Sequence, residues 1–583
     1  MPLTLDFKRL GSIEMSYFLK KTTPSKKGLY LQIYEGKYIP GKGKRNFSFK
    51  SLGYVSDLIA NGIDDPVAYG QRLVDELNSA DVKKIGDVPV TKNIGYFLLK
   101  IMLDALDIDD TLRIMTRSKK LHFDMAAFLR AMIYAQVVNP GSKHNAFEKV
   151  LPALYECETF SYDQILETVQ YIGEDYQKYI ELFNHQISAL YGRHTEKTYF
   201  DCTNYYFEID LPFEDKQKGP SKEERKSPII GQALMLDCDQ IPVAMKMYPG
   251  NQSEKPFLRE TIEDMKTRYE IDGKVIQVAD KGLNCAQNIY SAVKEANDGY
   301  IFSKAILGTS LPQPEREWIL YENETNLWHE VYDSAHNLRY RYKEAVDSYE
   351  YKCKPYQDGD EISFTVKEKR IVTFNPRLAK KKRSEIANEV EKAIKKLSLK
   401  AAAREDFGDC AKYVKFVAKD KDGNIHKIRP QINQDKIDEA MKYAGYNLLV
   451  TSETSMPAEE VYNAYHQLWR IEESFRIMKT YLEARPVYLQ TKESIYGHFL
   501  ICYLALTTLR LLEFKVFEQS VSSAQLIEYI RSFNVTEQSN GEYINNTTKS
   551  ETYQTVEKTL GIAKIGQLYL KKKDLQAILN AWI

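Results

Sequence analysis

The chain has 583 residues, of which 43% are hydrophobic and 28% are charged, and its formal net charge is zero. This length exceeds what one simple core covers, so several domains are expected, and the composition excludes wholesale disorder. A neutral chain still binds nucleic acid if its basic residues cluster, because phosphate binding depends on the local charge. The seven cysteines include no C-x-x-C pair, which disfavours a disulfide framework or a structural zinc site and fits a cytoplasmic protein.

Neither the most apolar stretch of the chain nor its first residues suggest a membrane partner. The most apolar stretch, residues 497–510, is too short and too interrupted to predict a membrane span. The first nine residues lack the apolar core of a signal peptide. We therefore expect a cytoplasmic protein without a membrane partner.

Residues 1–55 read as short strands joined by turns. Two segments, 30–34 and 46–52, alternate between apolar and polar side chains, and a basic turn separates them. Eleven lysines and arginines stand here against three acidic residues, a local net charge of +8, with tyrosines and phenylalanines between them. This pattern favours a DNA-contacting surface, with Lys42, Lys44 and Arg45 of the turn as contacts, over a hairpin that is simply solvated.

The next 135 residues or so, 56–190, change to a helical pattern, as in residues 93–103 and 125–135, with a loop at 139–143. They predict a helical region that either binds DNA or holds two subunits together, and the sequence does not choose between these roles. The final region, 516–583, is also predicted to be helical.

A mixed α/β core is predicted between these two helical regions. Its first part, 191–310, contains three strands, a helix with Ser253 as its N-cap, a strand, a second helix and a further strand. An insertion, 311–445, follows, with strand-like pieces and a basic helix over 380–400 that is better explained as a solvated face than as a DNA contact. The second part of the core, 446–515, begins with a strand and continues into a helix.

That helix carries two stripes at helical spacing. Its apolar seam consists of Leu468, Ile471, Phe475, Met478 and Leu482. Beside it runs a second stripe, formed by Tyr465, Trp469, Glu472, Arg476 and Lys479. The simplest interpretation is a surface helix with a Glu472–Arg476 ion pair.

Three carboxylates are candidates for chemistry. Asp201 and Asp280 lie on or at the end of predicted strands, and Glu472 lies on the helix just described. Without histidine or cysteine partners they are hard oxygen ligands, suited to Mg²⁺ or Mn²⁺, and two such ions catalyse displacement at phosphorus. The nearby cations would hold phosphates, and Trp469 would stack on a base.

The same residues also have ordinary structural explanations. An aspartate beside a strand is most often a turn former or a salt-bridge partner, and Trp469 is equally suited to core packing. By spacing alone, Asp210, Asp237 and Asp239 are no worse as candidates than Asp201 and Asp280.

A family resemblance separates the candidates. Over residues 197–510 the chain resembles the DDE transposases of bacterial insertion sequences, in the group with an RNase H-like core interrupted by a β-rich insertion. Tyr465, Glu472 and Lys479 match the Y, E and K of that group's Y-(2)-R-(3)-E-(6)-K signature, while Leu468 stands where arginine is expected. Because Leu468 belongs to the apolar seam, Arg476 is the better substitute for the missing cation. Further similar segments are 199–203, 231–236, 241–244, 249–254, 279–282, 469–473 and 497–500.

The resemblance implies a cut-and-paste transposase. Asp201, Asp280 and Glu472 would be the catalytic residues and would bind two Mg²⁺ ions, with Mn²⁺ able to substitute. Water would cut at the transposon end, the freed 3′-OH would attack the other strand to form a hairpin, and the ends would then be joined to target DNA.

The resemblance also implies how DNA is held. Tyr465, Arg476 and Lys479 would contact phosphates, and Trp469 would stack near displaced bases. A homodimer would act on double-stranded DNA, at the terminal inverted repeats, in the nucleoid. Two alternatives stay open: a catalytically inactive DNA-binding or assembly protein of the same fold, and a standalone RNase H-like nuclease.

Overall fold

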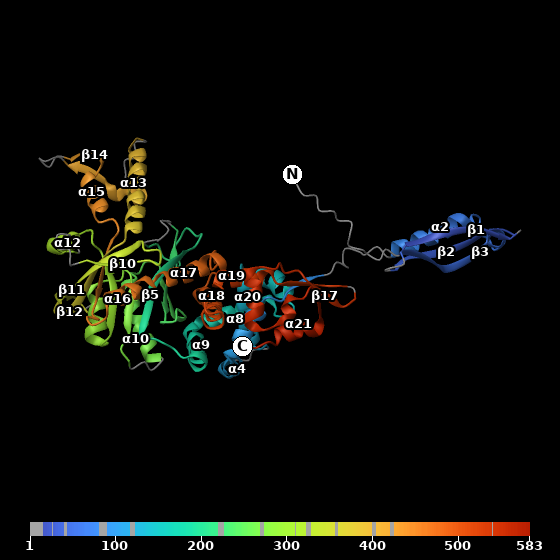
Figure 1. The fold of residues 1–583 in the computed structure, drawn as a ribbon, viewed down its shortest axis with the longest axis horizontal. Helices are drawn as coiled ribbons and strands as arrows, with labels where there is room; N and C mark the ends of the chain where they lie inside the picture. The colour runs from blue at the N-terminus through green and yellow to red at the C-terminus, as the bar shows by residue number, and fades with distance from the viewer. Residues whose placement is uncertain are drawn as a thin grey trace. The chain divides into compact units, whose positions relative to one another are not determined.

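The chain forms two compact units, Met1–Val90 and Thr91–Ile583. Figure 1 shows the computed structural model and labels its helices and strands. The structure describes residues 16–25, 27–39, 43–80, 90–116, 123–219, 227–268, 273–308, 311–321, 328–355, 359–398, 404–419, 425–538 and 540–582.

The first unit is a three-stranded antiparallel sheet with helices packed against it. Its elements are β1 (Ser16–Ser25), β2 (Gly28–Ile39), β3 (Gly43–Tyr54), α1 (Val55–Ala60) and α2 (Pro66–Ala80). The buried residues Leu31 and Ile33 point to one face of β2, so the alternation of the strand directs Tyr34 to the other face. There the Nζ of Lys20 lies 4.4 Å from the centre of the Tyr34 ring. The predicted strands of this region are therefore present, and one face combines cations with aromatic rings.

A nine-stranded sheet is the centre of the second unit. Five of its strands are β5 (Lys197–Tyr206), β6 (Ile229–Leu236), β7 (Pro242–Pro249), β8 (Ile276–Ala279) and β9 (Gly299–Lys304). They lie in the order β9-β8-β5-β6-β7; β5, β6 and β7 are antiparallel, whereas β8 and β9 run parallel to β5. This is the strand order of an RNase H-like core, so the predicted fold class is confirmed.

The strands of the insertion extend this same sheet. They are β10 (His329–Tyr332), β11 (Leu338–Cys353) and β12 (Ile362–Phe374), and β15 (Tyr446–Thr451) joins β12 to β9. β15 pairs with β9 on one side and with β12 on the other, so β9 has no exposed edge. Through β15, the strands of the insertion are continuous with the sheet of the core. The rest of the insertion stands beside the sheet: α12 (Gln313–Leu320), α13 (Pro376–Ser398), α14 (Arg404–Phe407), η4 (Gly408–Tyr413), β13 (Val414–Lys419), β14 (Ile425–Ile432) and α15 (Gln434–Lys442).

The two faces of the sheet have separate cores. On one face, Phe200 and Ala279 pack with α10 (Lys255–Arg268), α11 (Ala286–Tyr290) and the π-helical turn η3 (Ser291–Glu295). On the other face, Tyr199 and Val278 belong to a larger core that continues into the helical layer. The helices nearest this face are α16 (Ala458–His466) and α17 (Trp469–Arg476), followed by the π-helical turn η5 (Ile477–Tyr481).

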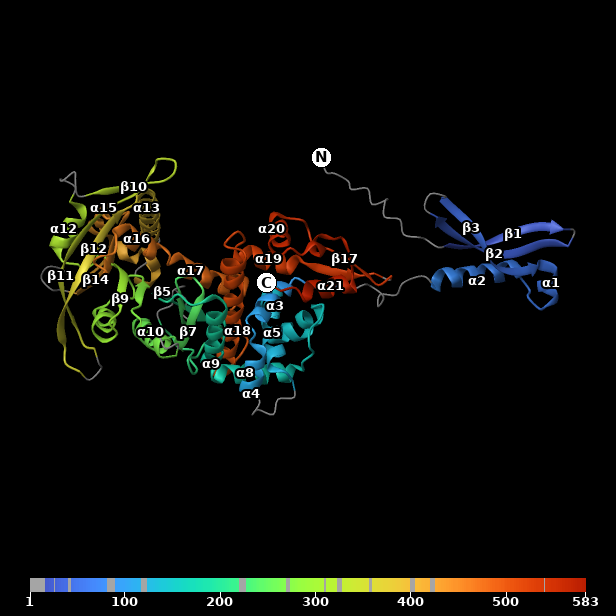
Figure 2. The ribbon, with the colours of Figure 1, turned by 60° about the horizontal axis from the view of Figure 1, so that its bottom comes forward.

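The helical layer is built around α18 (Lys492–Leu511) and the turn η6 (Leu512–Val516). Figure 2 shows α18 beside α8 and α5, which it contacts. Lys492–Val516 is long and apolar enough to span a membrane, but its apolar window is entirely buried inside the protein, as in the core helix of a globular domain. The other helices of this layer are α3 (Phe97–Ala105), α4 (Asp109–Thr116), α5 (Met125–Val138), α6 (Lys143–Asn145), η2 (Ala146–Val150), α7 (Leu151–Ala153), α8 (Tyr162–Glu174) and α9 (Tyr176–Tyr191).

The C-terminal region adds short strands to its helices. Its helical elements are α19 (Ser523–Ser532), α20 (Glu551–Leu560), η7 (Ala563–Gly566) and α21 (Lys572–Leu579). Between them, β16 (Asn534–Glu537), β17 (Glu542–Asn545) and β18 (Tyr569–Lys571) form a four-stranded sheet with β4 (Thr91–Asn93). The strands, which the sequence pattern did not indicate, connect the end of the chain to the start of the second unit. The six domains proposed from the sequence stay predictions.

Candidate active site

Asp201 and Asp280 lie level with each other on neighbouring parallel strands. Phe200 of β5 is paired with Ala279 of β8, and each aspartate is the next residue along its strand direction. Tyr199 and Val278, two residues earlier in each case, are in the core on the α17 face. Because side chains alternate along a strand, both aspartates are directed to that same face. The structure therefore brings together two acids that are 79 residues apart in the chain.

Backbone amides orient both carboxylates. The Gly282 N–H donates to Asp280 Oδ1 at 2.8 Å, within the turn that follows β8, and the Cys202 N–H donates to Asp201 Oδ1 at 2.7 Å. Both aspartates are partly buried. A backbone N–H that donates to a carboxylate oxygen fixes the orientation of that carboxylate, which is what a metal site at a sheet edge requires.

The helix that carries Glu472 is broken, although the sequence predicted a continuous one. α16 ends at His466, α17 begins at Trp469, and the N–H of Leu468 donates to the Tyr465 carbonyl at 3.1 Å in a tighter i→i+3 turn. The apolar seam survives this break. All its members are at most 9% exposed: Leu468, Ile471, Phe475, Met478 and Leu482.

Tyr465 connects Glu472 with Asp280. Burial raises the pKa of the Tyr465 phenol most, the negative charges of Asp280 and Glu472 raise it further, and hydrogen bonds with Ser303 and Asn447 oppose the increase. One phenol thus lies within electrostatic reach of both carboxylates. The tyrosine of the signature therefore lies near both of these acids.

Glu472 and its neighbour Glu473 have opposite environments. Glu472 is exposed and forms no ion pair with any residue that the structure describes. Glu473 points inward, and its carboxylate lies 3.4 Å from Arg476, 3.3 Å from Arg470 and 3.1 Å from Arg510. The Glu472–Arg476 pair of the simplest interpretation is therefore wrong, because Arg476 pairs with Glu473. This leaves Glu472 available for an external ligand.

The other residues of the stripe divide between solvent and the sheet. Trp469 is 47% exposed, so it is no core residue, and its ring stacks on the Arg470 guanidinium at 3.9 Å. Lys479 lies in the π-helical turn, and its Nζ is 5.2 Å from the ring centre of Tyr205 on β5. Tyr205 and Asp201 are four residues apart on β5, so their side chains point to the same face of the sheet. Lys479 therefore lies over the face that carries the aspartate.

Two of the three competing aspartates have ordinary partners. Asp237 is buried and lies 2.6 Å from Arg193, and Asp239 lies 2.8 Å from both His194 and Lys515. Asp210 is exposed in the loop after β5. These three residues fit the structural roles that the sequence analysis left open for them.

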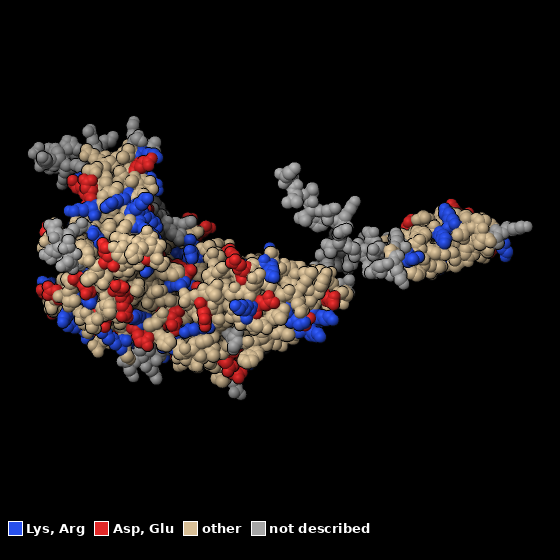
Figure 3. Space-filling view, viewed as in Figure 1, with Lys and Arg blue, Asp and Glu red and all other residues tan. Residues whose placement is uncertain are grey.

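Three basic residues of the first unit and the basic helix of the insertion were considered as DNA contacts from the sequence. Lys42 and the side chain of Lys44 lie outside the described residues, whereas Arg45 is exposed on β3. In Figure 3, lysines and arginines gather on α13 and at its base. On that helix Lys381 and Lys382 pair with Glu385, and Lys395 pairs with Glu391, as expected for a solvated face.

The donor set fits Mg²⁺ chemically. In the part of the chain that the structure describes, no three His, Cys, Asp or Glu side chains converge closely enough to hold one ion. Magnesium sites in proteins nevertheless use one or two carboxylates per ion and complete the shell with water and substrate phosphate. Two level aspartates and a nearby glutamate agree with that pattern.

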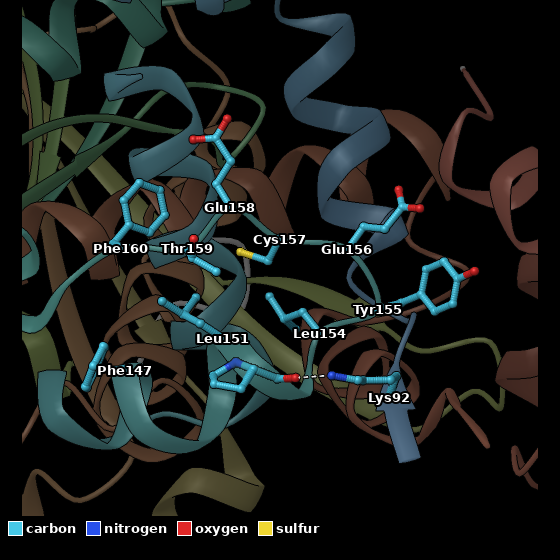
Figure 4. Close-up of a pocket in the computed structure, with 11 residues that line it drawn as sticks. Lys92, Phe147, Leu151, Leu154, Tyr155, Glu156, Cys157, Glu158, Thr159 and Phe160 are labelled. Carbon is cyan, nitrogen blue, oxygen red and sulfur yellow. Dashed lines mark hydrogen bonds between the residues drawn. The ribbon is translucent and has the colours of Figure 1, made fainter. Parts of the chain in front are cut away.

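The helical layer has an open pocket elsewhere, shown in Figure 4. Its volume is about 880 Å³, and its lining includes Lys92, Cys157 and Phe160. No residue predicted for the site lines it. This pocket is therefore separate from the acidic residues at the sheet edge.

Two residues that support this region were not predicted from the sequence: Tyr205, beside Lys479, and Arg510, which contacts α17. Tyr205 was available from the two-residue alternation that begins at Asp201. Arg510 was available as a charged residue inside an apolar helix, a placement that requires buried partners.

A comparison with protein-family models gives a match for this chain. The family model described as transposase DDE domain matches residues 193–508, more than half of the chain. Among curated proteins, none matches. One solved structure, described as a piggyBac transposase synaptic complex with hairpin DNA, has 10% sequence identity and a TM-score of 0.35 over 84% of each chain, too low a similarity to support an inference.

Proposed function

The chain belongs to the transposase DDE domain family, and from this premise we propose that it is a cut-and-paste DNA transposase. It would cleave transposon ends through a hairpin intermediate and join them to target DNA. The observation that supports this most is the level placement of Asp201 and Asp280 on one face of the sheet, with Glu472 on the helix above that face.

The three carboxylates would hold Mg²⁺, with Mn²⁺ able to substitute. When bound, the metal supplies Lewis-acid stabilisation of charge at the attacking and leaving oxygens of the phosphodiester. The backbone amides of Cys202 and Gly282 keep the two aspartates oriented for this task. Exposed Glu472 reaches the site from the helix side.

The other residues of the stripe would position DNA. Lys479, over the aspartate side of β5, would bind a phosphate next to the scissile one, and Arg476 would bind a phosphate further along the strand. Tyr465 would donate its phenolic proton to a phosphate oxygen, since its raised pKa keeps it protonated. Trp469, stacked on Arg470, presents a ring to a displaced base.

The first unit would recognise the terminal inverted repeats. Its basic and aromatic face, with Lys20 and Tyr34, has the composition of a nucleic-acid contact, and Arg45 is exposed on β3. Cutting two ends together implies a homodimer on DNA. Such an enzyme would work in the cytoplasm, on the nucleoid.

The test is a product assay with DNA that carries the element's own ends. Wild-type protein and Mg²⁺ should yield a nick, a hairpin and then a joined product, and Asp280→Asn should yield none of the three. Asp239→Asn is the matched control, since that aspartate pairs with His194 and Lys515 away from the acids.

Two results would replace the proposal. Cutting without any joined product would indicate a standalone nuclease. Binding of the ends with no Mg²⁺-dependent cutting by the wild type would indicate an inactive DNA-binding or assembly protein.

A further inference from the structure

Arg510 is a charged residue inside the most buried helix of the protein. Its side chain is 0% exposed on α18, whose neighbouring side chains are almost all apolar. Its Nη2 donates to three acceptors on α17: the Arg470 carbonyl at 3.3 Å, Glu473 Oε2 at 3.1 Å and Ser474 Oγ at 3.0 Å. One guanidinium therefore holds both the backbone and two side chains of the helix that carries Glu472.

These three contacts flank Glu472 on both sides in sequence. Arg470 precedes it by two residues, and Glu473 and Ser474 follow it. A helix held at one point can still rotate about its axis, whereas contacts one turn apart fix both rotation and translation. Because Glu473 and Ser474 point inward to Arg510, the exposed Glu472 lies on another side of the helix, where its charge and that of Asp280 both act on Tyr465.

A second carboxylate fixes Arg510 itself. Glu513, 3% exposed at the side chain, accepts from Arg510 Nη1 at 2.8 Å and lies 3.7 Å from Arg470. It also accepts from the Ser523 N–H at 3.1 Å and the Ser523 hydroxyl at 2.5 Å, at the start of α19. Two arginines and two glutamates thus form a charge-balanced network, Arg470–Glu473–Arg510–Glu513, between α17 and the helical layer.

Stability alone does not account for such a network. Well-packed apolar residues in place of a buried ion pair are often as stabilising or more so, because desolvating the charges costs about as much as their attraction returns. What a planar guanidinium adds is directional contact in a fixed geometry.

On this basis we propose that Arg510 is a positioning residue that sets the register of α17 and thereby directs the Glu472 carboxylate to the metal site. The inference rests on the proposed function, since it takes Glu472 as a metal ligand. Arg510 itself touches neither metal nor DNA in this assignment and acts through Glu473, Ser474 and the Arg470 carbonyl.

The direct test is Mn²⁺ binding to the full-length chain, measured by calorimetry or by the loss of the free-ion paramagnetic resonance signal. Arg510→Lys keeps the charge but loses the planar fork. We expect its Mn²⁺ affinity to fall by about 10- to 100-fold, as for loss of a residue that orients a metal ligand. Nicking should require correspondingly more Mn²⁺, while binding of the terminal DNA stays at the wild-type level.

The matched control is Arg370→Lys. Arg370 is likewise buried, 3% exposed at the side chain, and pairs with two glutamates, Glu368 at 2.7 Å and Glu315. It lies on β12, where Glu368 and Arg370 alternate with Ile371 of the α17-side core and so face away from Glu472. This variant should lose thermal stability as Arg510→Lys does and keep the wild-type Mn²⁺ affinity.

The outcomes separate the inference from the proposed function. Wild-type Mn²⁺ affinity in Arg510→Lys, or an equal loss in Arg370→Lys, overturns the positioning role. If Arg510→Lys does not fold, Glu473→Gln replaces it, because this variant removes the same contact from the α17 side. Its Mn²⁺ affinity should then fall as predicted for Arg510→Lys, and a wild-type affinity would overturn the positioning role. If Glu472→Gln binds Mn²⁺ as the wild type does, the metal assignment itself fails and the inference falls with it.

Discussion

At the scale of single residues, two adjacent glutamates, Glu472 and Glu473, have opposite environments. Periodicity and the signature predicted Glu472, and the structure leaves it exposed near Asp280 and Tyr465. The ion-pair network around Glu473 was not predictable, because two of its members, Arg510 on α18 and Glu513 on η6, lie about 40 residues further along the chain. Local spacing favours an i,i+4 pair with Arg476 and contains no information about such a distant partner.

The two glutamates should respond differently to the loss of charge. Glu473→Gln leaves Arg510 with less compensation inside the core, so the free energy of unfolding should fall by about 3 kcal/mol. Glu472→Gln alters an exposed side chain and should unfold at the wild-type denaturant concentration. Urea unfolding of both variants checks this. Equal midpoints for the two variants would contradict the prediction that only Glu473 contributes to stability.

His498 makes the stability of the protein sensitive to acid. Complete burial, with Lys143 nearby, lowers the pKa of the imidazole to about 3. Its folded pKa is below the ordinary value, so its contribution is complete above about pH 6.5 and is lost as the pH falls toward 3. Over that range this group should remove about 1.4 kcal/mol per pH unit.

The measurement is urea unfolding of wild type and His498→Gln between pH 4 and pH 7. As the pH falls, the unfolding free energy of the variant should decrease less steeply than that of the wild type. The difference in slope should correspond to the uptake of about one proton on unfolding. Parallel curves would show that His498 does not titrate in this way.

At the scale of elements, a break and a π-helical turn shape the helix that carries the signature. The 3.6-residue period identified the seam correctly, since every seam residue is buried. It did not identify the break before Trp469 or the wide turn from Ile477 to Tyr481, because both leave the apolar pattern unchanged. Lys479 lies in the wide turn, with its Nζ 5.2 Å from the ring centre of Tyr205, whereas Arg476 pairs with Glu473 inside the regular part of α17.

The position of α18, and with it Arg510, depends on a close helix crossing with α8. A Cβ atom on Gly497 would lie 1.9 Å from the Val169 carbonyl oxygen, and one on Gly173 would lie 1.8 Å from the Glu493 carbonyl oxygen. Gly497→Ala should therefore force the helices apart and cost about 1–3 kcal/mol of unfolding free energy.

Gly273→Ala is the control for this crossing, because a Cβ atom there meets no other atom within 4 Å. Thermal unfolding should show a lower midpoint for Gly497→Ala and an unchanged one for Gly273→Ala. A wild-type midpoint for Gly497→Ala would mean that the crossing is not tight.

At the scale of the whole molecule, the class of the core was accessible from the sequence and the extent of the sheet was not. Three antiparallel strands followed by alternating helices and strands predicted a mixed α/β core, and the family resemblance implied that it is RNase H-like. That β12 would pair with β15, and β16 with β4 more than 400 residues away, depends on tertiary contacts that short patterns do not record.

The charge of the first unit should decide DNA affinity even though the chain is neutral. Arg45→Glu in the full-length protein should weaken binding to the terminal DNA and reduce the slope of log affinity against log salt by about 1. Lys381→Glu on α13, whose lysine already pairs with Glu385, is the control and should leave both quantities near wild type. Fluorescence anisotropy at several salt concentrations measures them, and equal effects of the two variants would remove the special role of the first unit.

The most direct test of the central claim is the rate of Mg²⁺-dependent nicking of the element's terminal DNA by Glu472→Gln in a single turnover. The exposed position of Glu472 predicts a variant that folds and binds DNA as the wild type does. Its nicking rate should be lower by at least about 100-fold, as expected when a metal ligand is lost. A rate within about threefold of the wild type, that is, a change below about 0.7 kcal/mol in the barrier, would show that Glu472 does not act with Asp201 and Asp280.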